Sequence, residues 1–108
     1  MANGSTDKRT MNIQCEDLHA QAIAAREAGD SAKEEALYRQ IIIINPQYKL
    51  AHNDLGIILE DMGQIDKAEE AYKKEIEYNP EDHNAYSNLI KLLRAQDRDS
   101  DALKIAEE

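Results

Sequence analysis

The sequence predicts an all-α protein, a solenoid of stacked antiparallel helical hairpins, and two observations carry this prediction. The first is a period of 34 residues, under which glycine, tyrosine, proline and alanine positions recur: Gly29 and Gly63, Tyr38 and Tyr72, Pro46 and Pro80, Ala68 and Ala102. The second is apolar spacing typical of helices between glycine turns and asparagine–proline ends. A fixed period of this length indicates hairpins that bury their apolar faces by stacking, and about two and a half fit in 108 residues.

The best-formed repeat spans residues 51–80. Its first helix carries one apolar stripe at helical spacing, made of Ala51, Leu55, Ile58 and Met62. After the turn at Gly63, the second helix places four residues on one face: Ala68, Ala71, Tyr72 and Ile76. Gly56 lies inside the first helix, where glycine costs about 1 kcal/mol relative to alanine. We expect close approach of the paired helix to compensate for it.

The flanking segments follow the same plan less regularly. Residues 1–11 are polar and aperiodic, and we expect them to be disordered. Asn12 is a plausible N-cap for a helix to about residue 28, and a second helix spans about 31–44 before Asn45-Pro46. A third hairpin starts at 83 and its second helix near 100. One domain is thus predicted over 12–108, with repeats at about 15–48, 49–82 and 83–108, the last incomplete.

Composition restricts the class of partner. The net charge of −9 argues against nucleic acid and anionic membranes as partners, because few cations could neutralise phosphates. No apolar run reaches the ~18 residues that span a bilayer, and no signal peptide is recognisable. Cys15 is the one cysteine, which favours a reducing compartment and a packing role. We expect a cytoplasmic protein.

The middle repeat resembles the tetratricopeptide repeat family through Leu55-Gly56, Gly63, Ala68, Tyr72 and Pro80. The chain departs from the family pattern at four positions: Glu34 where alanine is usual, His52 for the bulky signature residue, Leu59 for an aromatic residue and Asp97 for the turn glycine. The resemblance implies a right-handed superhelix whose first helices line a concave groove that holds a peptide or a partner helix.

The groove positions follow from the resemblance, residue by residue. The first repeat supplies Glu16, His19, Ile23 and Arg26; the second supplies Leu50, Asn53, Ile57 and Glu60; the third supplies Asn84, Ser87, Asn88, Lys91 and Arg94. This set predicts a mixed groove with two isoleucines at its floor, acid from the middle repeat and a basic end.

One subgroup of the family binds the acidic C-terminus of heat-shock chaperones through lysine, asparagine and arginine. This chain has His19, Ile23 and Asn84 at three of those positions. Only the string Tyr86-Ser87-Asn88 is similar, so we do not expect that specificity.

The sequence predicts no catalytic residue, cofactor or metal site. His52 occupies a packing position, and His83 lacks neighbours at a metal-ligand spacing. Asp97 to Asp101 resembles a calcium loop, but Ala102 stands at the position that requires glycine. The repeat register explains this stretch as a turn and a helix start.

Two apolar features point to self-association as an alternative. Ile41 to Ile44 face all round a helix; we expect Ile41 and Ile44 to pack inside, or Ile42 and Ile43 to form a contact patch. Leu103 and Ile105 lie in the last helix with no following helix to cover them.

The function that these observations favour is a protein–protein interaction module. It is expected to bind a peptide or helix of a protein partner in the groove and to act as a scaffold or adaptor. Two alternatives stay open: a regulatory or assembly fragment of a larger enzyme, and a self-associating scaffold, for example a homodimer.

Overall fold

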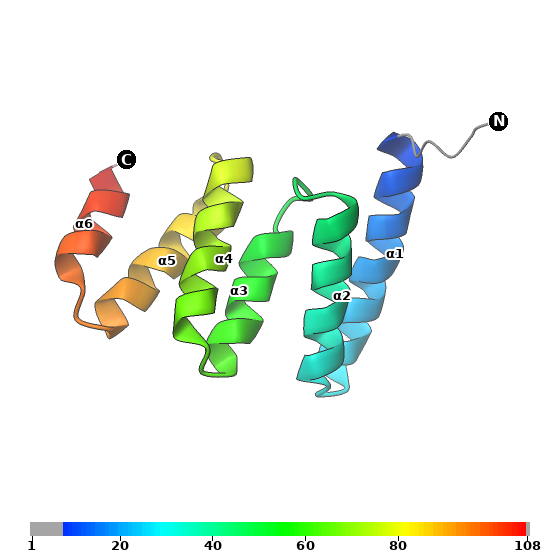
Figure 1. Ribbon diagram of the computed structural model, residues 1–108, viewed down its shortest axis with the longest axis horizontal. Helices are drawn as coiled ribbons and strands as arrows, with labels where there is room; N and C mark the ends of the chain where they lie inside the picture. The colour runs from blue at the N-terminus through cyan, green and yellow to red at the C-terminus, as the bar shows by residue number, and fades with distance from the viewer. Residues whose placement is uncertain (1–7, 108) are drawn as a thin grey trace. The chain divides into compact units, whose positions relative to one another are not determined.

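The computed structural model describes residues 8–107, and within that range the chain forms α-helices without any strand. The helices are α1 (Lys8–Glu27), α2 (Ser31–Ile44), α3 (Ala51–Asp61), α4 (Ile65–Tyr78), α5 (His83–Ala95) and α6 (Asp99–Glu107). They pair in chain order as α1–α2, α3–α4 and α5–α6, each joined by a short turn (Figure 1). The all-α fold built of helical hairpins is thus confirmed. The chain divides into two units, one that ends at Tyr48 and one that begins at Lys49.

The first unit is the hairpin of α1 and α2. Its core combines small residues of α1 with larger ones of α2: Cys15, Ala22, Ala25, Leu37, Tyr38 and Ile41. Gly29 makes the turn in the left-handed region at φ +76°, which costs glycine little. Asp30 then caps α2 by accepting a hydrogen bond from the backbone N–H of Lys33 at 3.1 Å.

The first helix starts earlier than the sequence analysis predicts. It begins at Lys8 rather than after Asn12, so residues 8–11 of the expected disordered segment are helical. Lysine, arginine and methionine are good helix formers, and no glycine or proline interrupts this stretch. The remainder of that segment, residues 1–7, lies outside the described residues.

The second unit contains α3 to α6. Its core is formed by the predicted stripes and by α5: Leu55, Ile58, Leu59, Ala68, Ala71, Tyr72, Ala85, Leu89, Leu92, Leu93 and Ala102. The ring of Tyr72 lies directly against Gly56, so the expected close approach of the paired helix is confirmed. Met62 departs from the predicted stripe; it is 42% exposed because α3 ends before it, at Asp61.

The apolar pattern of the sequence does not predict the buried carboxylates of the structure. Glu34 is 4% exposed and accepts a hydrogen bond from Arg26 Nε at 2.7 Å. The Arg26 cation explains how an acid can replace the usual alanine at this position, since a buried charge needs a partner.

Among the described helices, none is long and apolar enough to cross a membrane.

Candidate interaction surface

Four predicted groove residues lie on α1 in the first unit, and two of them contact tyrosine side chains of the same unit. Glu16 is exposed and Ile23 is 40% exposed. The His19 ring lies 5.9 Å from the ring of Tyr38 and 6.0 Å from that of Tyr48. Arg26 binds Glu34 and also donates to the Tyr38 hydroxyl at 3.1 Å. His19 and Arg26 are therefore held by contacts within the first unit, although the Arg26 side chain is 53% exposed.

On α3 the four predicted groove residues differ in how accessible they are. Leu50, at the start of the helix, is half-buried with φ +72°. Asn53 is only 3% exposed, whereas Ile57, one turn later, is 39% exposed. Glu60 is exposed but accepts a hydrogen bond from the Tyr72 hydroxyl at 2.8 Å. Burial, together with this bond, raises the pKa of Tyr72, so the hydroxyl stays a donor.

A side-chain hydrogen bond joins α3 and α5 on this surface. Asn88 Nδ2 donates to Asn53 Oδ1 at 2.9 Å. The structure thus brings Asn53 and Asn88 together, although they are 35 residues apart. The contact joins one predicted groove residue of the second repeat to one of the third.

The other predicted groove residues of α5 are exposed to solvent. Asn84, Ser87, Lys91 and Arg94 are all exposed. No ion pair with another described residue engages Lys91 or Arg94. Their two positive charges are therefore available to an acidic group of a partner, in a protein whose net charge is −9.

The most buried charged residue of the second unit is Glu75, which is 0% exposed and was not among the predicted residues. Its carboxylate accepts hydrogen bonds from backbone N–H groups at the start of α3. The 34-residue period indicates that Glu75 occupies a core position, because it aligns Glu75 with Ile41, which is also 0% exposed. An acid at a core position of the repeat indicates a specific polar partner.

The histidine and cysteine that were interpreted as packing residues do pack. His52 is 7% exposed and stacks on Tyr78 with ring centroids 5.4 Å apart. Cys15 is fully buried, its Sγ lies 3.9 Å from the Ile41 carbonyl oxygen, and burial raises its pKa. Both interpretations are confirmed.

The stretch that resembles a calcium loop is a turn followed by the start of α6. Arg98 binds Asp101 at 2.9 Å, and Ala102 is fully buried. Among the described residues, no group of three or more His, Cys, Asp or Glu side chains is arranged to hold a metal ion.

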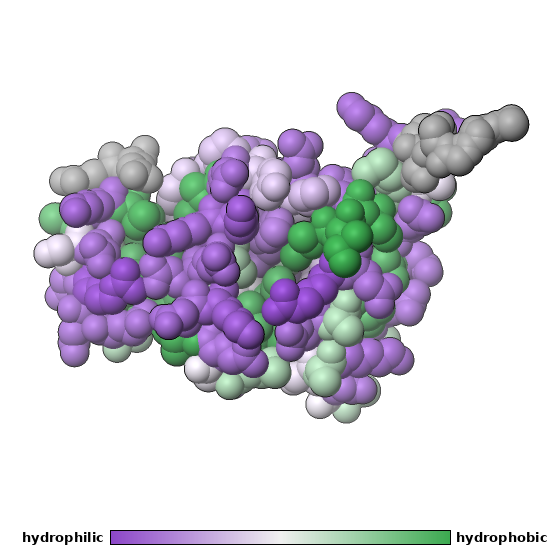
Figure 2. All heavy atoms as spheres, in the orientation of Figure 1, coloured by the Kyte–Doolittle hydropathy of each residue, from purple (hydrophilic) through white to green (hydrophobic). Residues whose placement is uncertain are grey.

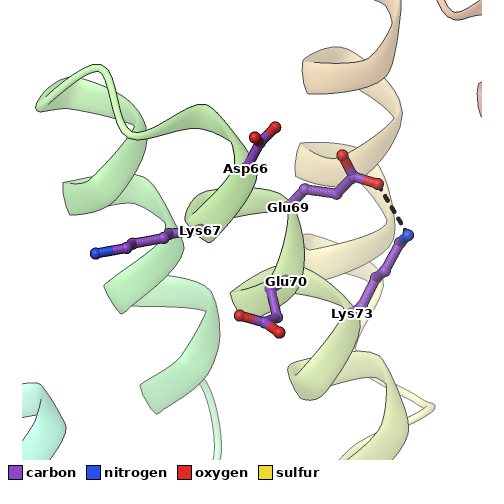
Figure 3. Close-up of a pocket in the computed structure, with 5 residues that line it drawn as sticks. All are labelled: Asp66, Lys67, Glu69, Glu70 and Lys73. Carbon is purple, nitrogen blue, oxygen red and sulfur yellow. Dashed lines mark ion pairs between the residues drawn. The ribbon is translucent and has the colours of Figure 1, made fainter.

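A shallow hollow runs along α4, lined by Asp66, Lys67, Glu69, Glu70 and Lys73. Figure 3 shows that these side chains do not converge, since Lys67 points away from Glu69 and Lys73. Lys73 and Glu69 pair with each other at 2.8 Å. The hollow is a solvated, charged face of α4, and the side chains that line it do not converge on a common point.

The residues considered for self-association fall into two classes. Ile43 is 79% exposed and Leu103 is 59% exposed, whereas Ile42 and Ile105 are half-buried. Figure 2 shows an apolar patch around the end of α2. Within the isoleucine run Ile41 is fully buried, as expected, and Ile44 is half-buried.

Comparisons with known proteins agree with this architecture. Residues 50–82 match the family described as Tetratricopeptide repeat. A crystal structure of MamA protein superposes with a TM-score of 0.77 at 25% identity over 86% of this chain and 51% of that one. A second crystal structure of MamA gives a TM-score of 0.79 at 25% identity over 84% and 53%. The chain therefore spans about half the length of these structures. A search of curated proteins found no significant match.

Proposed function

We propose that this chain, a member of the tetratricopeptide repeat family, binds a peptide or helix of a protein partner through the first helices of its repeats. Repeats of this kind are typically interaction modules rather than catalysts. In the proposal the chain is a non-enzymatic scaffold or adaptor in the assembly of a complex. A cytoplasmic location is part of the proposal, since the one cysteine cannot form an intrachain disulfide.

The observation that carries the proposal is the surface shared by α3 and α5. It combines an exposed apolar side chain, Ile57, with the Asn53–Asn88 hydrogen bond and the free cations Lys91 and Arg94. An apolar anchor beside polar and charged groups is the usual composition of a binding patch. This arrangement fits a partner segment that carries an apolar residue and an acidic group.

The test compares partner capture by the wild type and by a surface variant. The variant Ile57→Ala, Lys91→Ala and Arg94→Ala removes exposed groups only. Asn53 is left intact because it is buried and holds Asn88. We expect the proteins that the wild type retains to be lost by this variant, with helix content by circular dichroism unchanged.

The matched control changes three exposed residues of α4, Lys67→Ala, Glu70→Ala and Lys74→Ala. It removes the same number of side chains from a second helix of a repeat. We expect it to retain the wild-type partners. Equal recovery of every partner by the surface variant would exclude the first helices of the second unit as the docking site.

A further inference from the structure

The helix α5 differs in charge from the other described helices. It contains no aspartate or glutamate, whereas each of the others contains at least two acids. Lys91 and Arg94 are both exposed on α5, and their i, i+3 spacing makes their side chains neighbours on the helix surface. In a protein whose net charge is −9, α5 therefore carries a local concentration of positive charge.

The 34-residue period explains why Arg94 is available to a ligand. It aligns Arg94 with Arg26 of the first repeat, which donates to Glu34 at 2.7 Å and to the Tyr38 hydroxyl at 3.1 Å. The third repeat has alanine in place of both acceptors, at positions 102 and 106. No ion pair with another described residue engages Arg94. The third repeat thus keeps the arginine without the groups that hold its equivalent.

Lys91 is a second change that is specific to the third repeat. The period aligns it with Ile23 and Ile57, which are 40% and 39% exposed. A lysine therefore replaces the apolar side chain that the first two repeats expose at this position. Both cations of α5 lie at predicted groove positions, so the third repeat changes the charge of the groove and not its helix.

The Asn53–Asn88 hydrogen bond of 2.9 Å relates these cations to the apolar residue of α3. Ile57 lies one turn after Asn53 on α3, and Lys91 lies one turn after Asn88 on α5. Residues one turn apart are neighbours on a helix surface. A ligand that covers the bonded asparagines therefore reaches an apolar side chain on one helix and a cation on the other.

The end of α3 carries the opposite charge. Glu60 and Asp61 are exposed there, and Glu60 accepts a hydrogen bond from the Tyr72 hydroxyl at 2.8 Å. Among the described residues, neither acid forms an ion pair with Lys91 or Arg94. An acidic ligand is repelled at the end of α3 and attracted at α5, so its acidic group is favoured over α5.

We propose that the partner segment is a short acidic peptide whose glutamate or aspartate side chains bind Lys91 and Arg94 while an apolar side chain contacts Ile57. This inference rests on the docking site proposed above and identifies the chemistry of its ligand. A guanidinium binds a carboxylate through two parallel hydrogen bonds, and lysine adds a point charge. No free chain terminus is required, since this chain differs from the subgroup that binds one at three of its positions.

The test is a ¹⁵N NMR titration of the whole protein, at low salt, with a short peptide of glutamate pairs separated by leucine and blocked at both ends. We expect this peptide to shift the backbone N–H signals of Ile57, Lys91 and Arg94. A peptide with glutamine in place of glutamate should bind at least about tenfold more weakly. The shifts should be lost in about 1 M salt, where the Debye length is about 3 Å.

The variant Lys91→Gln with Arg94→Gln removes only the two charges, and its affinity for the glutamate peptide should fall about tenfold. The matched control, Lys67→Gln with Lys104→Gln, removes two other exposed cations and should bind as the wild type does. A glutamate peptide that leaves the signals of Lys91 and Arg94 unmoved, or binds the first variant as tightly as the wild type, would overturn the proposal. Shifts produced only by a phosphoserine peptide of the same design would overturn it as well.

Partner capture separates this inference from the docking site itself. If captured proteins are lost with Ile57→Ala but kept by Lys91→Gln with Arg94→Gln, the docking site stands and the acidic ligand is wrong. If both variants keep every partner, the docking site and the acidic ligand are both wrong. Loss with the double charge variant, together with binding of the glutamate peptide, supports both.

Discussion

Gly56 illustrates how a single residue sets the spacing of a hairpin. A β-carbon at this position would lie 2.6 Å from Cε1 and 2.8 Å from Cδ1 of the buried Tyr72 ring. Alanine improves helix propensity by about 1 kcal/mol, but overpacking a core costs about 1–3 kcal/mol. We predict that Gly56→Ala lowers the free energy of unfolding by about 1 kcal/mol, measured by urea denaturation.

The control for this prediction is the same substitution in a Tyr72→Leu background. Leucine lacks the ring edge that meets the new β-carbon, so there Gly56→Ala should be neutral or stabilising. A higher urea midpoint for Gly56→Ala in the wild-type background would show that the helices can separate at no cost.

At the scale of elements, Arg98 fastens the turn between α5 and α6 to α4. Its guanidinium binds Glu69 at 2.6 Å and 3.3 Å and Asp101 at 2.9 Å. The hydrogen bond from Arg98 is the main reason that the pKa of Glu69 is lowered. A lowered pKa in the folded state means that this stabilisation is present above the usual pKa of glutamate and is lost as pH falls.

We predict that Glu69→Gln lowers the free energy of unfolding at pH 7 by about 1 kcal/mol, because Arg98 is partly exposed and solvent weakens the pair. The difference from the wild type should vanish as pH falls below about 4, near the usual pKa of glutamate. Glu70→Gln, at an exposed position of the same helix, should change stability by less than about 0.5 kcal/mol. A constant difference across pH would contradict the ionic origin.

The helix bounds that the sequence predicts best are those marked by glycine or proline. Gly29 and Asn45-Pro46 bound α2 on both sides, and its predicted span agrees with the structure. The start of α1 has no such signal, only helix propensity. The hydrogen-bond partners of the buried acids Glu34 and Glu75 could not be predicted from the local pattern. Their donors lie 8 and 22–25 residues away in the sequence.

The same limit applies to the predicted groove residues. The predicted groove residues lie on α1, α3 and α5, except Leu50, which precedes α3 as its N-cap. The 34-residue period did not reveal that Arg26 and Glu60 contact the tyrosines of their own hairpins, or that Asn53 is buried against Asn88. Helical spacing fixes which face a residue occupies, whereas its availability depends on the side chains of neighbouring helices.

For the whole molecule, net charge and exposed apolar residues act in opposite directions. A net charge of −9 opposes association between copies, whereas the exposed Ile43 near the end of α2 and the exposed Leu103 of α6 favour it. We predict a mass of 12.2 kDa by light scattering across a concentration series, unchanged by Ile43→Lys or Leu103→Lys.

Repeating the series at 1 M salt, where the Debye length falls to about 3 Å, separates the two effects. A mass that stays at one chain shows that the apolar residues do not drive association even when repulsion is screened. A mass that doubles, and returns to one chain in Ile43→Lys, would instead establish a dimer through the end of α2. A doubling abolished only by Leu103→Lys would assign that dimer to α6. Either doubling would contradict the predicted monomer mass and favour the self-associating scaffold.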